Sequence, residues 1–199
     1  MLDRYIVEIV EEYDLCPWSR SARLGGEVAI DILWGTPTID MWASAAETLL
    51  AKTGVRVAMV VAPELPCTSG ELRTIRDEVS ARVKNVGVAH FHPDAPLELA
   101  TPPRLVPFLR RSPDPLLQLV PLALLDSLRT GTQVVTETEL QAKMLAGTAV
   151  IPRDDVGDLI AEANHARVSR DAVAIQATLD DIRADRERSY ARVKISTSR

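Results

Sequence analysis

The nearly continuous apolar run over residues 55–62 is the feature that most limits how this chain can fold. Small and β-branched side chains fill it, a composition typical of a strand buried on both faces of a sheet. Two further strands are predicted, one over residues 27–34 and one over residues 86–91, where apolar side chains recur with partial alternation. Each pair of neighbouring strands is separated by a segment with helical periodicity. The chain therefore alternates between strands and helices.

The signals at the ends of these helices support the same interpretation. Thr36 and Pro37 have the residue types of an N-cap and a first helical position, and Gly54 is a matching stop. Thr68 and Glu71 form a capping-box pattern at the start of the next helix. Strand–helix–strand units of this kind form right-handed crossovers. We therefore expect the α/β class, with a small, mostly parallel sheet and helices on its faces.

The flanking segments give weaker predictions. Apolar spacing predicts an amino-terminal helix over residues 2–13, which Pro17 ends. Residues 94–115 are rich in proline and are interpreted as an ordered surface loop or lid. Residues 116–120 are predicted as a fourth strand, with a short buried helix as the alternative. A helix is expected to begin at Pro121 and run to Arg129, with Gly131 as its stop. Thr136 and Glu139 form a second capping box, for a helix ending near Gly147.

The chain is divided into an α/β domain, residues 1–153, and a helical extension, residues 154–199. Apolar residues in the extension follow alternating steps of four and three. They are Val168, Ala172, Ile175, Leu179 and Ile182. One interpretation is a terminal helix that packs on its own domain. The alternative is an arm that forms a homodimer or recruits a partner.

Composition excludes several classes of protein. A net charge of -5 does not favour a nucleic-acid surface, and no apolar run reaches the length of about 20 residues that spans a bilayer. The amino terminus lacks the pattern of a signal peptide, and Cys16 and Cys67 are the only cysteines. We therefore expect a cytoplasmic protein that binds neither nucleic acid nor membranes.

Three proline-containing clusters carry the candidate chemistry, and each lies at one end of a predicted regular element rather than inside it. The first holds Cys16, a candidate nucleophile if a nearby cation lowers the pKa of its thiol, with Trp18 as a candidate substrate contact. The second holds His92, a candidate general base that Asp94 would orient.

The third cluster holds Arg110, Arg111 and Ser112. The planar guanidinium groups of Arg110 and Arg111 suit a carboxylate or phosphate, and Arg111 is the expected anchor. Ser112 followed by Pro113 resembles a helix start, whose free amides also favour anions.

Alternative interpretations stay open for each cluster. Cys16 also fits a buried core thiol, His92 a histidine bonded to loop carbonyls, and the arginines a solvated basic pair. His90 shares the strand parity of His92, so both can face one ligand, and with Cys16 they would form a three-ligand zinc site. No nucleotide-binding or serine-hydrolase motif is present, and no particular cofactor is indicated.

The three clusters together resemble an uncharacterised bacterial family, domain of unknown function 1415. The resemblance rests on Leu15 to Trp18, Phe91 to Pro93 and Arg111 to Pro115, in that order, and it covers roughly residues 1–130. It implies a grouping and no activity.

The leading hypothesis from sequence is an enzyme that acts on a small anionic metabolite by acyl transfer, hydrolysis or thiol redox chemistry. The first alternative is a non-catalytic binding or assembly protein, which oligomerises or recruits a partner through its carboxyl-terminal helix. The second is a metal-dependent enzyme with cysteine and histidine ligands.

Overall fold

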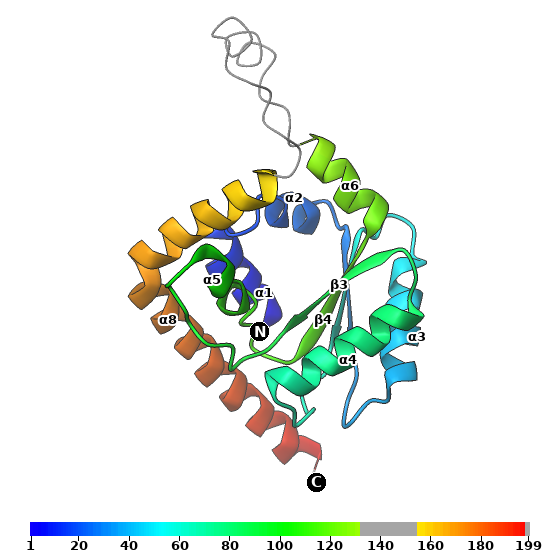
Figure 1. The fold of residues 1–199 in the computed structure, drawn as a ribbon. Coiled ribbons are helices and arrows are strands. Elements are labelled where there is room, and N and C mark those ends of the chain that lie inside the picture. Colours follow the sequence, from blue (N-terminus) through cyan, green and yellow to red (C-terminus); the bar gives the residue numbers. More distant parts are fainter. Residues whose placement is uncertain (132–154, 198–199) are drawn as a thin grey trace, which may run out of the picture.

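A computed structural model describes residues 1–131 and 155–197, in which one β-sheet lies between two layers of helices (Figure 1). The strands are β1 (Val28–Ile32), β2 (Val57–Val61), β3 (Val86–Phe91) and β4 (Leu116–Pro121). The helices are α1 (Leu2–Tyr5), the π-helix η1 (Ile6–Glu11), α2 (Ser19–Leu24), α3 (Ile39–Leu50), α4 (Ser69–Arg82), α5 (Pro102–Leu109), α6 (Leu122–Gly131) and α8 (Asp155–Thr197). The α/β class expected from the sequence is confirmed. The predicted helix that starts at Thr136 lies outside the described residues.

The sheet is mixed, so the expectation of a mostly parallel sheet is wrong. Its strand order is β1-β2-β4-β3, in which β1 and β2 pair in parallel and β4 runs antiparallel to both of its neighbours. The reason is the path of the chain after β3. A backbone hydrogen bond of 3.0 Å from His92 to the carbonyl of Arg110 holds the two ends of this excursion at the same edge of the sheet. Strand β4 starts from that edge and therefore runs back between β2 and β3.

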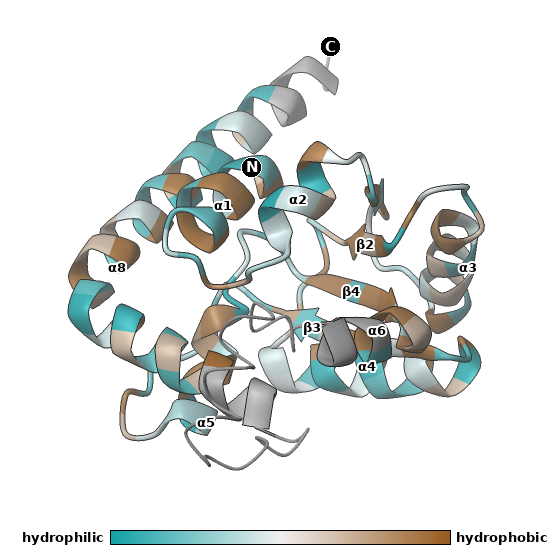
Figure 2. Ribbon diagram, turned by 90° about the horizontal axis from the view of Figure 1, so that it is seen from above, coloured by the Kyte–Doolittle hydropathy of each residue, from teal (hydrophilic) through white to brown (hydrophobic). Residues whose placement is uncertain are grey.

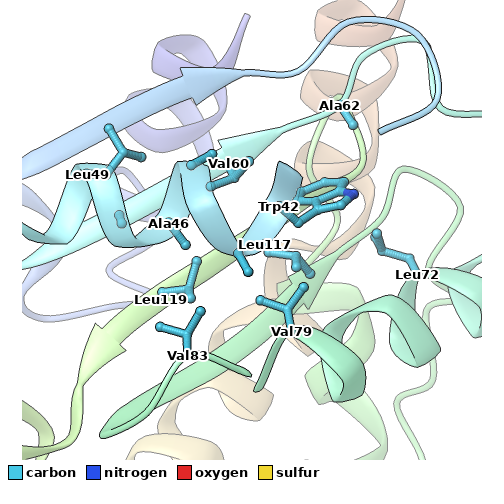
Figure 3. Packing of buried hydrophobic residues seen from close by; sticks show 13 residues of the cluster. Trp42, Ala46, Leu49, Val60, Ala62, Leu72, Val79, Val83, Leu117 and Leu119 are labelled. Carbon is cyan, nitrogen blue, oxygen red and sulfur yellow. The ribbon is translucent and has the colours of Figure 1, made fainter. Parts of the chain in front are cut away.

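One face of the sheet is covered by α3 and α4 (Figure 3). Trp42 is fully buried there and packs with alternate residues of the central strands, such as Val60 and Leu117. Figure 2 shows the apolar strands β2 and β4 between the helical layers. Gly87 in β3 lets α6 approach closely, because an added Cβ atom would lie 2.9 Å from a methyl group of Leu125. Burial of a large apolar side chain such as those of Val60 and Leu117 stabilises a fold by about 1.5–3 kcal/mol.

The other face is covered by helices from both ends of the chain. Residues of η1, α5 and α8 share one hydrophobic cluster, in which Val168, Ile175 and Ile182 are almost completely buried. Figure 1 shows α8 running along α1 and α5. The periodic apolar residues of the carboxyl-terminal helix therefore pack on the chain's own domain, as the first interpretation of that helix predicted.

Ion pairs fix these helices to the rest of the chain. On α8, Arg186 donates to the carboxylate of Asp114 at 2.5 Å and to the carbonyl of Pro63 at 2.8 Å. At the amino terminus, the buried carboxylate of Glu11 accepts two hydrogen bonds from Arg23, of 2.7 and 2.8 Å, which join η1 to α2. Local sequence signals cannot predict either contact, because each joins two separate elements of the fold.

Several helix boundaries differ from those that the sequence predicted. The N-cap of α3 is Thr38 rather than Thr36, and its hydroxyl accepts from the backbone of Met41 at 3.4 Å. The amino-terminal segment is α-helical only over its first turn and continues as the π-helix η1. The capping box of Thr68 and Glu71, in contrast, is confirmed.

Helix α5 occupies part of the segment that was expected to be a loop. Pro102 and Pro103 stand in its first turn. Proline has no backbone N–H, and this is tolerated there because the first N–H groups of any helix have no partner within the helix. The proline content of residues 94–115 therefore marks a helix start as well as loops.

Candidate functional site

Two of the three proline-containing clusters meet at one edge of the sheet. Strands β1, β2 and β3 end at this edge and β4 begins there, so the loops that follow β2 and β3 and the segment before β4 lie together. Backbone hydrogen bonds join them, from Ala62 to Pro115 at 2.9 Å and from His92 to Arg110 at 3.0 Å. In open α/β sheets this is the edge where ligand sites form.

A small hollow lies beside the end of β3, between the start of α4 and the end of α5. Its polar lining consists of Ser69, His90, His92 and Arg110. Its apolar lining consists of Ala95, Val106 and Pro107. The two histidines line the same hollow, as their spacing along the strand predicted. The volume is about 60 Å³, room for on the order of four water molecules.

Arg110 is the charged group in the lining of this hollow. No hydrogen bond or ion pair of its guanidinium occurs among the described residues, although the residue is half-buried. Burial lowers the pKa of Arg110, and the charge of Arg76 lowers it further. The positive charge of Arg110 therefore stands near a second cation and in partly dehydrated surroundings.

His90 lies in the same positive surroundings. Burial lowers the pKa of its ring below the ordinary value of 6.5, and the guanidinium groups of Arg76 and Arg110 lower it further. The ring is therefore uncharged at neutral pH. Its Nδ1 atom and the Nε atom of Arg76 are buried and have no hydrogen-bond partner within the described part of the chain.

His92 is buried, and the backbone fixes its ring. The N–H of Asp94 donates to Nδ1 at 3.1 Å, so Nε2 carries the proton and donates to the carbonyl of Cys67 at 2.8 Å. The carboxylate of Asp94 does not orient the ring, because it pairs with Arg183 on α8 at 2.9 Å. His92 thus matches the interpretation of a histidine bonded to loop backbone, and its role as a base stays a prediction.

The two neighbouring arginines take separate paths. The Nε of Arg111 donates to the carbonyl of Pro93 at 2.8 Å, and its terminal nitrogen donates to Gln176 on α8 at 2.7 Å. Arg111 therefore ties the edge of the sheet to α8, and Arg110 rather than Arg111 lines the hollow beside the histidines. Ser112 is buried, its hydroxyl bonds to the carbonyl of Asp114, and no helix begins there. The expected helix start at Ser112 is wrong, because the chain passes directly into β4.

Cys16 and Trp18 lie between the amino-terminal helices η1 and α2, and neither lines the hollow. Burial raises the pKa of the Cys16 thiol, although the backbone N–H groups of Trp18 and Ser19 oppose this. No cation within the described residues lowers it. Trp18 is half-buried and precedes α2. The nucleophile assigned to Cys16 and the substrate contact assigned to Trp18 stay predictions.

The three predicted zinc ligands do not form a metal site in the described residues, although His90 and His92 line the same hollow. Among residues 1–131 and 155–197, no group of three or more histidine, cysteine or acidic side chains is arranged to hold a metal ion, and Cys16, His90 and His92 are no exception. The same residues contain no helix that is long and apolar enough to cross a lipid bilayer.

Sequence reasoning missed several residues of the hollow. Ser69 was visible only as part of a capping box, and Val106 and Pro107 lay in a segment predicted to be a loop. Arg76 carries no local signal, because its importance comes from the packing of α4 beside β3. The Arg-Arg pair predicted an anion anchor, and that stays a prediction. The sequence does not show which of the two arginines has no partner among the described residues.

The fold and the hollow together define an α/β protein with a basic hollow at the edge of a mixed sheet. Comparison with protein-family models, with curated proteins and with solved structures finds no match to this chain. The grouping suggested by the three clusters stays a prediction.

Proposed function

We propose that the protein binds a small organic anion in the hollow lined by Ser69, His90, His92 and Arg110. One observation carries this proposal: Arg110 is half-buried, lines the hollow and has no carboxylate partner among the described residues. A buried charge without a partner is costly unless a ligand neutralises it. An anion in the hollow would remove that cost.

Other arginines of this protein show how their charges are balanced, in contrast to Arg110. Arg4 pairs with Glu8, Asp181 and Asp185. Arg186 pairs with Asp114 at 2.5 Å. These two guanidinium groups are balanced by carboxylates, and Arg111 is held by a carbonyl and an amide. Arg110 has neither kind of partner among the described residues, in a place with room for a ligand.

The proposal concerns binding, and the enzyme hypothesis has less support. Cys16 does not line the hollow, and burial raises the pKa of its thiol. His92 would need to break the hydrogen bond from the backbone of Asp94 before its Nδ1 could accept a proton. Catalysis through these residues stays a prediction that the binding proposal does not require.

The experiment compares Arg110→Met with Arg104→Met. Arg104 lies on α5, the helix that Arg110 follows as its C-cap. It is exposed and forms an ion pair of 3.7 Å with Glu98, so its replacement controls for the loss of a charge. Binding is followed in nuclear magnetic resonance spectra of the full-length protein with sodium butyrate, acetate and phosphate, at an ionic strength held constant with sodium chloride. At least one of these anions is expected to shift the resonances of residues that line the hollow.

Arg110→Met is expected to weaken this binding by about tenfold or more, because a hydrogen bond to a charged group contributes about 1.5–3 kcal/mol. Arg104→Met is expected to change it by less than about twofold. Without ligand, Arg110→Met is expected to melt at the same temperature as the wild type or higher, because it removes an unbalanced buried charge. Equal binding by the two variants, or no response to any anion beyond that to chloride, would contradict the proposal.

A further inference from the structure

We infer that the ligand is a short aliphatic carboxylate, and not a phosphate; this inference rests on the proposed function of the hollow. The lining is divided into a polar part around Arg110 and an apolar part formed by Ala95, Val106 and Pro107. A ligand that fills both parts has a charged end and an apolar end.

The number of charges favours a monoanion. Arg110 is the one cationic side chain in the lining, and the nearby Arg76 already pairs with Asp77 at 2.8 Å. His90 adds no positive charge at neutral pH, because burial and the neighbouring arginines keep its ring neutral. A phosphoryl group carries about 1.5 to 2 negative charges near pH 7, so part of its charge would stay unbalanced.

The start of α4 does not supply the missing charge. Its capping box holds the carboxylate of Glu71 against the backbone N–H and hydroxyl of Thr68, at 2.7 and 2.8 Å. This negative group stands beside Ser69, which lines the hollow, and it opposes the attraction of the helix end for an anion. A doubly charged ligand is therefore disfavoured at this end of the hollow as well.

Size limits the apolar end. A volume of about 60 Å³ accepts roughly four to six non-hydrogen atoms, if each takes the space of one water molecule. A carboxylate uses three of them, and the planar fork of Arg110 suits its two oxygens. The remaining space fits the short chain of propionate or butyrate against Val106 and Pro107.

The test measures dissociation constants of the full-length protein for acetate, propionate, butyrate and inorganic phosphate at constant ionic strength. Each added methylene is expected to tighten binding by up to about fourfold as far as butyrate. Phosphate is expected to bind at least about tenfold more weakly than butyrate. Val106→Thr, which keeps the shape of the side chain but adds a hydroxyl, is expected to weaken butyrate binding severalfold and leave acetate binding unchanged. The control Val173→Thr alters an exposed position of α8 and is expected to change neither.

The outcomes separate the two proposals. Phosphate binding as tight as butyrate binding and dependent on Arg110 would overturn the carboxylate assignment while the anion site stands. The same holds if affinity does not increase with chain length, or if Val106→Thr weakens acetate as much as butyrate. If no anion binds in an Arg110-dependent way, the proposed function fails and this inference fails with it.

Discussion

Replacement of Arg186 by methionine is expected to destabilise the protein strongly, although Arg186 lies far along the carboxyl-terminal helix. Its guanidinium donates to the carboxylate of Asp114 at 2.5 Å and stacks 4.5 Å from the ring centre of Tyr190. The hydroxyl of Tyr190 donates to the other oxygen of the same carboxylate at 2.9 Å. Asp114 is only 4% exposed, so the loss of Arg186 leaves a buried carboxylate with one neutral partner.

The magnitude follows from this burial. Removing one member of a buried ion pair costs about 3–5 kcal/mol. The Arg186 side chain is 23% exposed, Tyr190 remains, and methionine preserves much of the packing of the arginine stem, so we expect the lower end, about 3 kcal/mol. For a chain of this size the melting temperature should fall by about 6–12 °C.

Urea denaturation, followed by circular dichroism, measures the free energy of unfolding of Arg186→Met beside a matched control. Arg188→Met, on the same helix, removes an exposed arginine that pairs with Asp185 at 3.6 Å, and it should cost less than about 0.5 kcal/mol. In an Asp114→Asn background the cost of Arg186→Met should fall markedly, because the buried charge is gone. A loss below about 1 kcal/mol, or equal losses for the two arginine variants, would refute the reasoning.

Three further predictions concern other parts of the chain. Ile175→Ala should lower the free energy of unfolding by about 2–5 kcal/mol in urea titrations, because Ile175 is fully buried. The control Val173→Ala, at an exposed position of the same helix, should change it very little. Similar losses for the two variants would mean that α8 does not pack as described. The ion pair with Arg23 holds the pKa of Glu11 below its ordinary value of 4.5, so the stabilisation by this pair is present above pH 4.5 and is lost as the pH falls through the lowered pKa. The difference in unfolding free energy between the wild type and Glu11→Gln should therefore shrink over that pH range. A difference that stays constant would contradict this prediction. In a protein carrying Cys67→Ser, Cys16 should react with iodoacetamide at pH 7 more slowly than a free thiol, as mass spectrometry would show, because burial raises its pKa; faster labelling would instead favour a nucleophile.

Local sequence signals predicted much of the fold. The capping box at Thr68 and Glu71, the buried apolar strand and the final strand-to-helix step at Pro121 all depend on neighbours within a few residues. Such signals fix element type but not strand direction. The antiparallel insertion of β4 depends on where the chain returns after α5, and no local pattern records that path.

For the candidate site too, the sequence determined some features and the tertiary structure decided the others. The sequence alone determined that the histidines lie at the end of one strand and that the arginine pair lies before the next. It did not determine that the two pairs meet, because a parallel arrangement of these strands would place them at opposite edges of the sheet. Tertiary structure decided that Arg111 is held by Gln176, while Arg110 has no such partner in the part of the chain that the structure describes, because α8 reaches one guanidinium and not the other. The balance of a charge depends on groups distant in sequence that packing brings within a few ångströms, so only the folded chain shows which cation is left for a ligand.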